Sequence, residues 1–419
     1  MSVSDVPLLP SSSPHLSYAL PTMKSHSSTL IAALALCHQS LSSPTYQTAP
    51  DHPSNGICTD YKIEKTIDFA ELQWTDPPFK TSFDVVDLYA RMASKDPAVF
   101  RPFAETPRNV SKTYEISATF CRPKNGTDAG EKTVLVATHG AGFDRRYWAS
   151  SYLPEKYSFV YHSLEAGYPV FYYDRAGVGA SSRTLNYTAQ PEPQIQLLAS
   201  MVRDIRGGQY TDSIKASKIV LVGHSFGSFV STGLLNKFPD LADAAVLTGI
   251  AFPNPSDIVN ILGKYALTVF GGRLISDVPS SSLPANADSF DDSHVAFGDI
   301  YSYAQAFLHH PQTAPDVAVA NYTFSITQPL PVSEFASLGN IDLRAPDFAG
   351  KVLITAGQYD VLCGGDCYAT FDAGVQNTTI FSNEGAVVET FVQPGAGHGA
   401  VFQEDNGARE RIFGFLGSV

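Results

Sequence analysis

The chain has 419 residues, of which 44% are hydrophobic and 16% charged, a composition that excludes a disordered or fibrous protein and predicts a large core. Its formal net charge of −13 argues against nucleic acid and anionic membranes as partners. No apolar run reaches the roughly 18 residues that a membrane-spanning helix needs, so no transmembrane helix is expected.

A charged start, a short apolar run and a small-residue exit near the N-terminus are the parts of a secretory signal. Met23-Lys24 precedes the apolar run 30–37, and Ser40-Leu41-Ser42 offers a cleavage site. We therefore expect a signal peptide over residues 1–42 and a secreted, extracellular protein. The polar residues before Met23 mean either a long polar start or initiation at Met23. A short buried helix is the alternative interpretation of the apolar run.

Five N-glycosylation sequons support secretion, because chance gives about two in a chain this rich in Ser and Thr. They begin at Asn109, Asn125, Asn186, Asn321 and Asn377. We therefore expect a glycoprotein.

The body of the chain alternates between strand and helix patterns. After a Pro- and Ser-rich linker at 44–56, near-continuous β-branched runs predict buried strands at 133–138, 169–173, 218–222, 244–248, 351–355 and 387–392. An earlier, antiparallel strand is expected at 114–122. Apolar residues at helical spacing predict helices over 195–205 and 230–238. The fold class is α/β, a mostly parallel sheet with helices on both faces.

The strongest chemical signal is Gly223-His-Ser225-Phe-Gly227, which joins the strand 218–222 to the following helix. A serine on such a sharp turn is exposed at the carboxyl edge of the sheet, and the glycines let strand and helix approach closely. The helix N-terminus directs amide groups at the reaction centre. Ser225 is therefore the expected nucleophile.

A serine hydroxyl needs a base, and that base needs an acid to orient it. His398, within Gly395-Ala-Gly-His-Gly399, follows the last strand, and Asp360 follows the strand 351–355. The predicted triad is Ser225, Asp360 and His398. Asp366 and, less well, Asp257 are alternative acids.

The oxyanion of a tetrahedral intermediate requires backbone donors. The amide of Phe226, next to the nucleophile, is one candidate. The other is the amide of Ala141, with Gly142 as the alternative, in the turn that begins at His139 after the strand 133–138. His139 itself is expected to brace this turn.

Residues 251–345 interrupt the strand–helix alternation and are rich in Pro, Ser and aromatic side chains. A structureless loop of this length is improbable in a folded domain, so we expect a largely helical cap. The core then comprises residues 43–250 and 346–419. The aromatic residues of the cap either line a pocket for a substrate with an apolar acyl or aromatic part, or form the cap's own core.

Removal of the signal takes Cys37 with it and leaves an even number of cysteines, as paired disulfides require. Cys363 and Cys367 flank two glycines and can close a tight turn that pins the loop of Asp360. The remaining pair is Cys58 with Cys121. Crossed pairings and four free thiols in a cytosolic enzyme are the alternatives, and the spacing is not that of a zinc site.

The HGAG turn at His139, Asp174-Arg-Ala-Gly-Val-Gly179, GHSFG, GQYD and GAGHG resemble, in this order, the motifs of the α/β-hydrolase superfamily. The resemblance extends from about Thr133 to the C-terminus. It is greatest to the capped branch that includes epoxide hydrolases, haloalkane dehalogenases and prolyl aminopeptidases. The first two use an aspartate nucleophile, so Ser225 indicates acyl transfer instead. The signal and sequons resemble those of secreted fungal members.

These features predict a serine hydrolase that cleaves a small-molecule carboxylic ester, lactones and thioesters included, without metal or cofactor. Alternatives are an acyltransferase or another biosynthetic enzyme of fungal natural-product metabolism, and an aminopeptidase. The aminopeptidase would bind an amine through cap carboxylates, for which the candidates are Asp288, Asp291, Asp292 and Asp299. A non-catalytic receptor is a fourth interpretation, although such proteins often lose a triad member.

Overall fold

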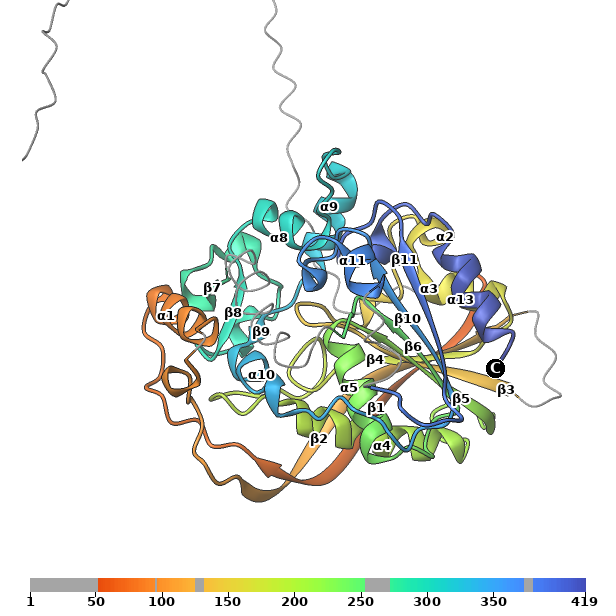
Figure 1. Cartoon of the computed structure of the whole chain (residues 1–419), viewed down its shortest axis with the longest axis horizontal. Helices are drawn as coiled ribbons and strands as arrows, with labels where there is room; N and C mark the ends of the chain where they lie inside the picture. The colour runs from red at the N-terminus through yellow and green to blue at the C-terminus, as the bar shows by residue number, and fades with distance from the viewer. Residues whose placement is uncertain (1–51, 95, 125–131, 253–271, 373–379) are drawn as a thin grey trace, which may run out of the picture. The chain divides into compact units, whose positions relative to one another are not determined.

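The computed structural model describes residues 52–94, 96–124, 132–252, 272–372 and 380–419 (Figure 1). The expected signal peptide, most of the linker, the first part of the cap and the sequons at Asn125 and Asn377 lie outside these residues. So does Asp257. The described part of the chain contains no helix long and apolar enough to cross a membrane.

The main sheet has eight strands in the order β1-β2-β4-β3-β5-β6-β10-β11. β2 is antiparallel to both β1 and β4, and the other strand pairs are parallel. The strands are β1 (Gly56–Glu71), β2 (Arg108–Pro123), β3 (Lys132–Thr138), β4 (Val170–Tyr173), β5 (Ala216–His224), β6 (Ala244–Thr248), β10 (Lys351–Gly357) and β11 (Val387–Gln393). All the predicted strands, including the antiparallel one, are confirmed.

Burial explains the central strands. The side chains of residues 134–137, 219–222 and 244–247 are fully shielded from solvent, as strands covered on both faces must be. In Figure 1, α4 and α5 lie together against one side of the central strands, and α2, α3 and α13 lie together on the other side. These helices are α2 (Pro154–Tyr157), α3 (Phe159–Glu165), α4 (Pro191–Arg206), α5 (Phe226–Lys237) and α13 (Ala408–Leu416). α4 and α5 confirm the two predicted helices, and the fold class is as predicted.

The N-terminal part adds two elements that the sequence analysis did not predict, β1 and the helix α1 (Ser82–Met92). β1 pairs with β2 along its whole length, with Cys58 opposite Cys121. The two cysteines form a disulfide in the structure, with Cα atoms 4.1 Å apart. This disulfide ties the first strand to the sheet.

The cap is inserted between β6 and β10. Its described part contains the helices α8 (Ile300–Phe307), α9 (Val317–Ser325) and α10 (Val332–Ala336), with several 3-10 turns. It also contains a small antiparallel sheet that the sequence did not indicate, formed by β7 (Gly272–Leu274), β8 (His294–Phe297) and β9 (Leu330–Pro331). Strands this short are below the length at which alternation gives a reliable signal.

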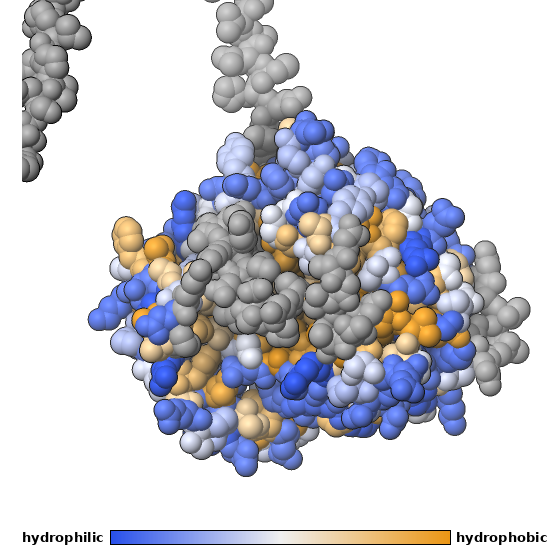
Figure 2. Space-filling model, viewed as in Figure 1, coloured by the Kyte–Doolittle hydropathy of each residue, from blue (hydrophilic) through white to orange (hydrophobic). Residues whose placement is uncertain are grey.

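Polar residues dominate the face seen in Figure 2, and apolar residues form smaller patches on it. Three of the five sequon asparagines belong to the described residues, and all three are exposed: Asn109, Asn186 and Asn321.

Candidate active site

Ser225 lies between β5 and α5 in a strained backbone conformation, with φ 52° and ψ −119°. Its amide donates to the Thr248 carbonyl at 2.9 Å. The flanking glycines are sterically required. A Cβ at Gly227 would lie 2.1 Å from the Thr138 carbonyl oxygen, and one at Gly223 would lie 2.6 Å from the Cα of Ser228. The local sequence therefore forces the sharp turn that presents Ser225.

Asp360 and His398 meet at the carboxyl edge of the same sheet. His398 Nδ1 is 2.9 Å from each carboxylate oxygen of Asp360, and both side chains are buried. Asp360 also accepts a hydrogen bond from the Leu362 amide at 2.8 Å. Asp366 is exposed and accepts from the Ala369 amide, so it is not the partner of His398.

The ring of His224 lies beside the ring of His398. It precedes Ser225 in the chain, and its centroid lies 5.0 Å from that of His398. Within the described residues no hydrogen bond joins the Ser225 hydroxyl to His398. The structure thus places the Asp360–His398 contact near the turn of Ser225, while the catalytic roles of the three residues stay predictions.

The loop of Asp360 is closed by the Cys363–Cys367 disulfide, whose Cα atoms are 5.0 Å apart. Gly364 and Gly365, between the cysteines, have φ values of +68° and +88°, which only glycine adopts readily. The amides of Cys363 and Gly365 both donate to the Asp360 carbonyl at 3.1 Å. The predicted pairing and the predicted turn are both present.

The candidate oxyanion donors lie on either side of Ser225. Phe226 is the first residue of α5, so its amide has no acceptor within the helix. A Cβ at Gly140 would lie 3.0 Å from the Ser225 Cβ, which places the turn of Ala141 against the nucleophile. The turn of Ala141 and the amide of Phe226 therefore lie next to Ser225, and their role as oxyanion donors stays a prediction.

Two other buried histidines, His139 and His224, lie near Ser225 and have neutral side chains. The Arg175 amide donates to His139 Nε2 at 3.0 Å, so Nδ1 carries the proton and donates to the Gly140 carbonyl at 2.8 Å. Burial and the nearby Arg175 cation lower the pKa of His139 to about 3. Burial and the neighbouring His398 lower the pKa of His224 well below its usual value. His139 braces its turn, as predicted.

Cap aromatic residues cover His398. The rings of Phe307 and His398 are 5.2 Å apart, and the Phe307 carbonyl accepts from the Gly399 amide at 2.7 Å. Phe307 also stacks on Tyr303, which contacts Phe297 edge to face. These side chains are buried, so they form the cap's own core and at the same time an apolar wall beside the site. Tyr301, in contrast, faces solvent.

Two of the four cap carboxylates that an aminopeptidase could use, Asp291 and Asp299, are engaged elsewhere. Asp299 caps α8 by accepting from the amides of Tyr301 and Ser302. Asp291 accepts from the Asn186 amide and contacts His294 and Ser293. Partial burial opposes ionisation of Asp291, but these hydrogen bonds outweigh it and lower its pKa. Neither carboxylate is free to bind a substrate amine.

Sequence reasoning missed two buried ion pairs next to the site. Arg145 donates to Asp174 at 2.7 Å, and Arg175 donates to Glu334 of α10 at 2.6 Å. The sequence indicated the segment Asp174–Gly179 only as a motif of the family that the chain resembles. Glu334 is an isolated carboxylate in the apolar stretch 330–336, and that isolation was the available signal.

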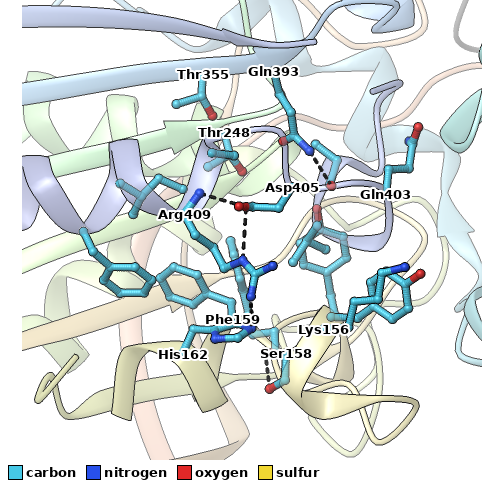
Figure 3. A pocket seen from close by; sticks show the side chains of 18 residues that line it. Lys156, Ser158, Phe159, His162, Thr248, Thr355, Gln393, Gln403, Asp405 and Arg409 are labelled. Atoms are coloured by element: carbon cyan, nitrogen blue, oxygen red, sulfur yellow. Dashed lines mark hydrogen bonds and ion pairs between the residues drawn. The ribbon is translucent and has the colours of Figure 1, made fainter. Parts of the chain in front are cut away.

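A separate pocket lies behind the turn of His398, between α3 and α13 (Figure 3). Its wall includes Ala400 and Val401, which follow His398 closely, but none of the three triad candidates. Arg409 at this pocket pairs with Asp405 and His162, as the dashed lines show. Arg409 of α13 thus links His162 of α3 to Asp405, in the turn before α13.

Comparison with known proteins agrees with this architecture. A model of the alpha/beta hydrolase family matches residues 134–410. Nothing among the curated proteins matches.

Solved structures similar to this chain include an esterase from Thermogutta terrifontis, with 17% identity, 73% of this chain and 94% of that chain covered, and a TM-score of 0.47. A carboxylesterase structure from Nitrososphaera gargenis has 16% identity, covers 73% and 95% of the two chains, and has a TM-score of 0.45. An alpha/beta hydrolase from Penicillium sp. sh18 has 15% identity, coverage of 73% and 94%, and a TM-score of 0.45.

The matched segment runs from β3 into α13 and contains Ser225, Asp360 and His398. The chain therefore belongs to the alpha/beta hydrolase family.

Proposed function

We propose that the chain is a secreted serine esterase, with Ser225 as nucleophile, His398 as general base and Asp360 as the acid that orients it. One observation carries the proposal. Both carboxylate oxygens of the buried Asp360 lie 2.9 Å from His398 Nδ1, and this contact lies at the same sheet edge as the strained turn of Ser225. A strained backbone at Ser225 costs free energy and contributes nothing to folding, so its presence near a carboxylate–imidazole pair favours a functional role.

The chemistry follows from these positions. The Ser225 oxygen attacks the ester carbonyl carbon while His398 Nε2 takes the hydroxyl proton, and Asp360 stabilises the resulting imidazolium. The carbonyl oxygen becomes an oxyanion and accepts hydrogen bonds from the Ala141 and Phe226 amides. The carbon–oxygen bond to the leaving alcohol then breaks, and that alcohol takes the proton from His398. Water repeats the sequence on the acyl-enzyme and releases the carboxylic acid.

The test uses purified mature protein and a fluorophosphonate probe, which reacts with activated serines. We expect wild type to be labelled and Ser225→Ala not to be. Ser231→Ala is the matched control, because this buried serine of the same helix only donates to the Gly227 carbonyl. Equal labelling of wild type and Ser225→Ala would remove the nucleophile assignment.

A substrate panel then separates the candidate reactions. Esters, lactones and thioesters of small apolar acids are the expected substrates, because the cap wall beside His398 is aromatic. Aminoacyl amides are expected to be poor substrates, because Asp291 and Asp299 are occupied within the cap. Preferred turnover of aminoacyl amides would favour the aminopeptidase alternative instead.

Secretion is a separate part of the proposal. It is supported by the apolar run at 30–37, by the two disulfides, which are typical of oxidising compartments, and by the exposure of the three described sequons. Expression in a secreting eukaryotic host should give a mature N-terminus near Ser43 and a gel shift on glycosidase treatment. A cytosolic product that retains Cys37 would contradict it.

A further inference from the structure

Arg175 follows β4 and is almost fully buried where the cap meets the core. Its guanidinium donates two hydrogen bonds to Glu334 of α10, at 2.6 and 3.1 Å, and the Glu334 side chain has no exposed surface. Gln194 of α4 donates to the same carboxylate at 3.3 Å. α10 is also fixed to the core by the Ser333 hydroxyl, which donates to the Ala189 carbonyl. The ion pair and these hydrogen bonds therefore connect α10 of the cap to the core.

The same arginine contacts both halves of the candidate oxyanion hole. Its guanidinium carbon lies 4.4 Å from the centroid of the Phe226 ring, a cation–π contact between two buried side chains. Its backbone amide donates to His139, which in turn donates to the Gly140 carbonyl, next to Ala141. One residue thus contacts Phe226 through its side chain and the turn of Ala141 through its main chain.

We propose that Arg175 is a positioning residue, held by Glu334 of the cap, that fixes the Phe226 and Ala141 amides for an oxyanion. The inference rests on the proposed esterase function and adds to it a dependence of transition-state binding on a contact with the cap. Arg175 does not touch the substrate. It acts because its planar guanidinium can stack on a ring and bind a carboxylate with two hydrogen bonds at once, which a lysine cannot do.

A purely structural ion pair would show different behaviour. Breaking one partner of any buried pair destabilises a protein, but replacing both partners by apolar residues often restores stability. If the pair only stabilises the fold, the apolar replacement should restore catalysis together with stability. If Arg175 positions the amides, stability should return while catalysis stays impaired. The two roles therefore separate in one double variant.

The experiment compares Arg175→Lys, Glu334→Gln and the double variant Arg175→Met/Glu334→Leu with wild type, all as full mature chains. Glu71→Gln is the matched control, since Glu71 is also a buried carboxylate with two cationic partners, Lys112 and Arg108. Glu71 lies at the end of β1, an edge strand of the main sheet. Active sites are counted by fluorophosphonate titration, and kcat, KM and Tm are measured on a small ester.

The decisive readout is inhibition by a trifluoromethyl ketone. Ser225 adds to its carbonyl carbon, the proton passes to His398, and the resulting hemiketal oxyanion needs the two amides. For both single variants and the double variant we expect kcat per active site to fall by about 10- to 100-fold with little change in KM. The inhibition constant should rise by the same factor. Glu71→Gln should change Tm only.

Two results would overturn the inference in an active wild type. One is a double variant with normal Tm, kcat and inhibition constant, and the other is an equal loss of kcat in Glu71→Gln. A wild type that neither reacts with fluorophosphonate nor hydrolyses any ester refutes the proposed function, and this inference with it. Should a single variant fail to fold, the double variant still decides.

Discussion

The core side and the cap side of the site are held by different kinds of contact. On the core side, Asp360 sits on a loop fixed by main-chain hydrogen bonds and by the Cys363–Cys367 disulfide. On the cap side, α8 covers His398 with Phe307, and Glu334 of α10 binds Arg175. The candidate triad residues are therefore held by the sheet and its loops, whereas the candidate oxyanion donor Phe226 contacts Arg175, which a side chain of the cap binds.

The largest effect should come from the core side, at the nucleophile. We expect Ser225→Ala to lower kcat by about a million-fold, because no other group can form the acyl-enzyme. Steady-state hydrolysis of the best ester of the panel measures this. A decrease of less than about a hundred-fold would show that the serine is dispensable, since residual catalysis by binding alone is small.

The acid comes next. Asp360→Asn should lower kcat by about ten thousand-fold, because the amide leaves the His398 ring in the wrong tautomer. Asp366→Asn is the control and should retain wild-type kcat, since this exposed side chain lies away from His398. The reverse ranking of the two variants would transfer the role of acid to Asp366.

The two disulfides should separate catalysis from stability. Replacing Cys363 and Cys367 by serine should lower kcat by up to about a hundred-fold, through displacement of Asp360, with a small change in Tm. Replacing Cys58 and Cys121 should leave kcat per folded molecule unchanged but lower Tm more, because that disulfide joins residues 63 apart. Thermal denaturation and active-site titration measure both. Full activity and unchanged Tm in the first variant would show that the loop needs no disulfide.

The smallest effect concerns pH and the support of the oxyanion turn. The pKa of His139 is about 3 in the folded chain and about 6.5 in an unfolded one. Between these values the unfolded chain binds a proton that the native chain does not, so stability falls as pH decreases from about 6.5. We expect His139→Gln to reduce the slope of the unfolding free energy against pH, measured by urea denaturation between pH 7 and 5. His224 should maintain part of the slope, and an unchanged slope would contradict the assignment.

The strands of the main sheet from β3 onwards could be predicted from the sequence alone. Val134, Ile219 and Leu353 belong to apolar runs buried on both faces, and such runs are visible without tertiary information. The loops of Ser225, Asp360 and His398 follow from those strands, because parallel strands bring their carboxyl ends to one edge. The structure brings Asp360 and His398 into contact near the turn of Ser225, and the roles of these residues stay predictions.

Two missed elements had a visible signal. In β1 the buried residues Ile63, Ile67 and Phe69 occupy alternate positions, but the polar residues between them weakened the pattern. In α1, Val85, Leu88 and Met92 recur at helical spacing.

The cap and the Arg175 contact had no comparable signal. The strands β7, β8 and β9 have only two to four residues each. Glu334 finds its partner 159 residues away, and such a pairing depends on how the cap folds onto the core. Local periodicity carries no information about a contact of that range.

The proposed mechanism requires an acyl-enzyme on Ser225, and this intermediate can be trapped. The protein is mixed with an activated aryl ester at low pH, where deacylation is slow, then quenched, digested and mapped by mass spectrometry. We expect one acyl group on the peptide that contains Gly223 to Gly227, with fragmentation placing it on Ser225. Hydrolysis of the ester with no adduct at Ser225, or with the acyl group on another residue, would contradict it.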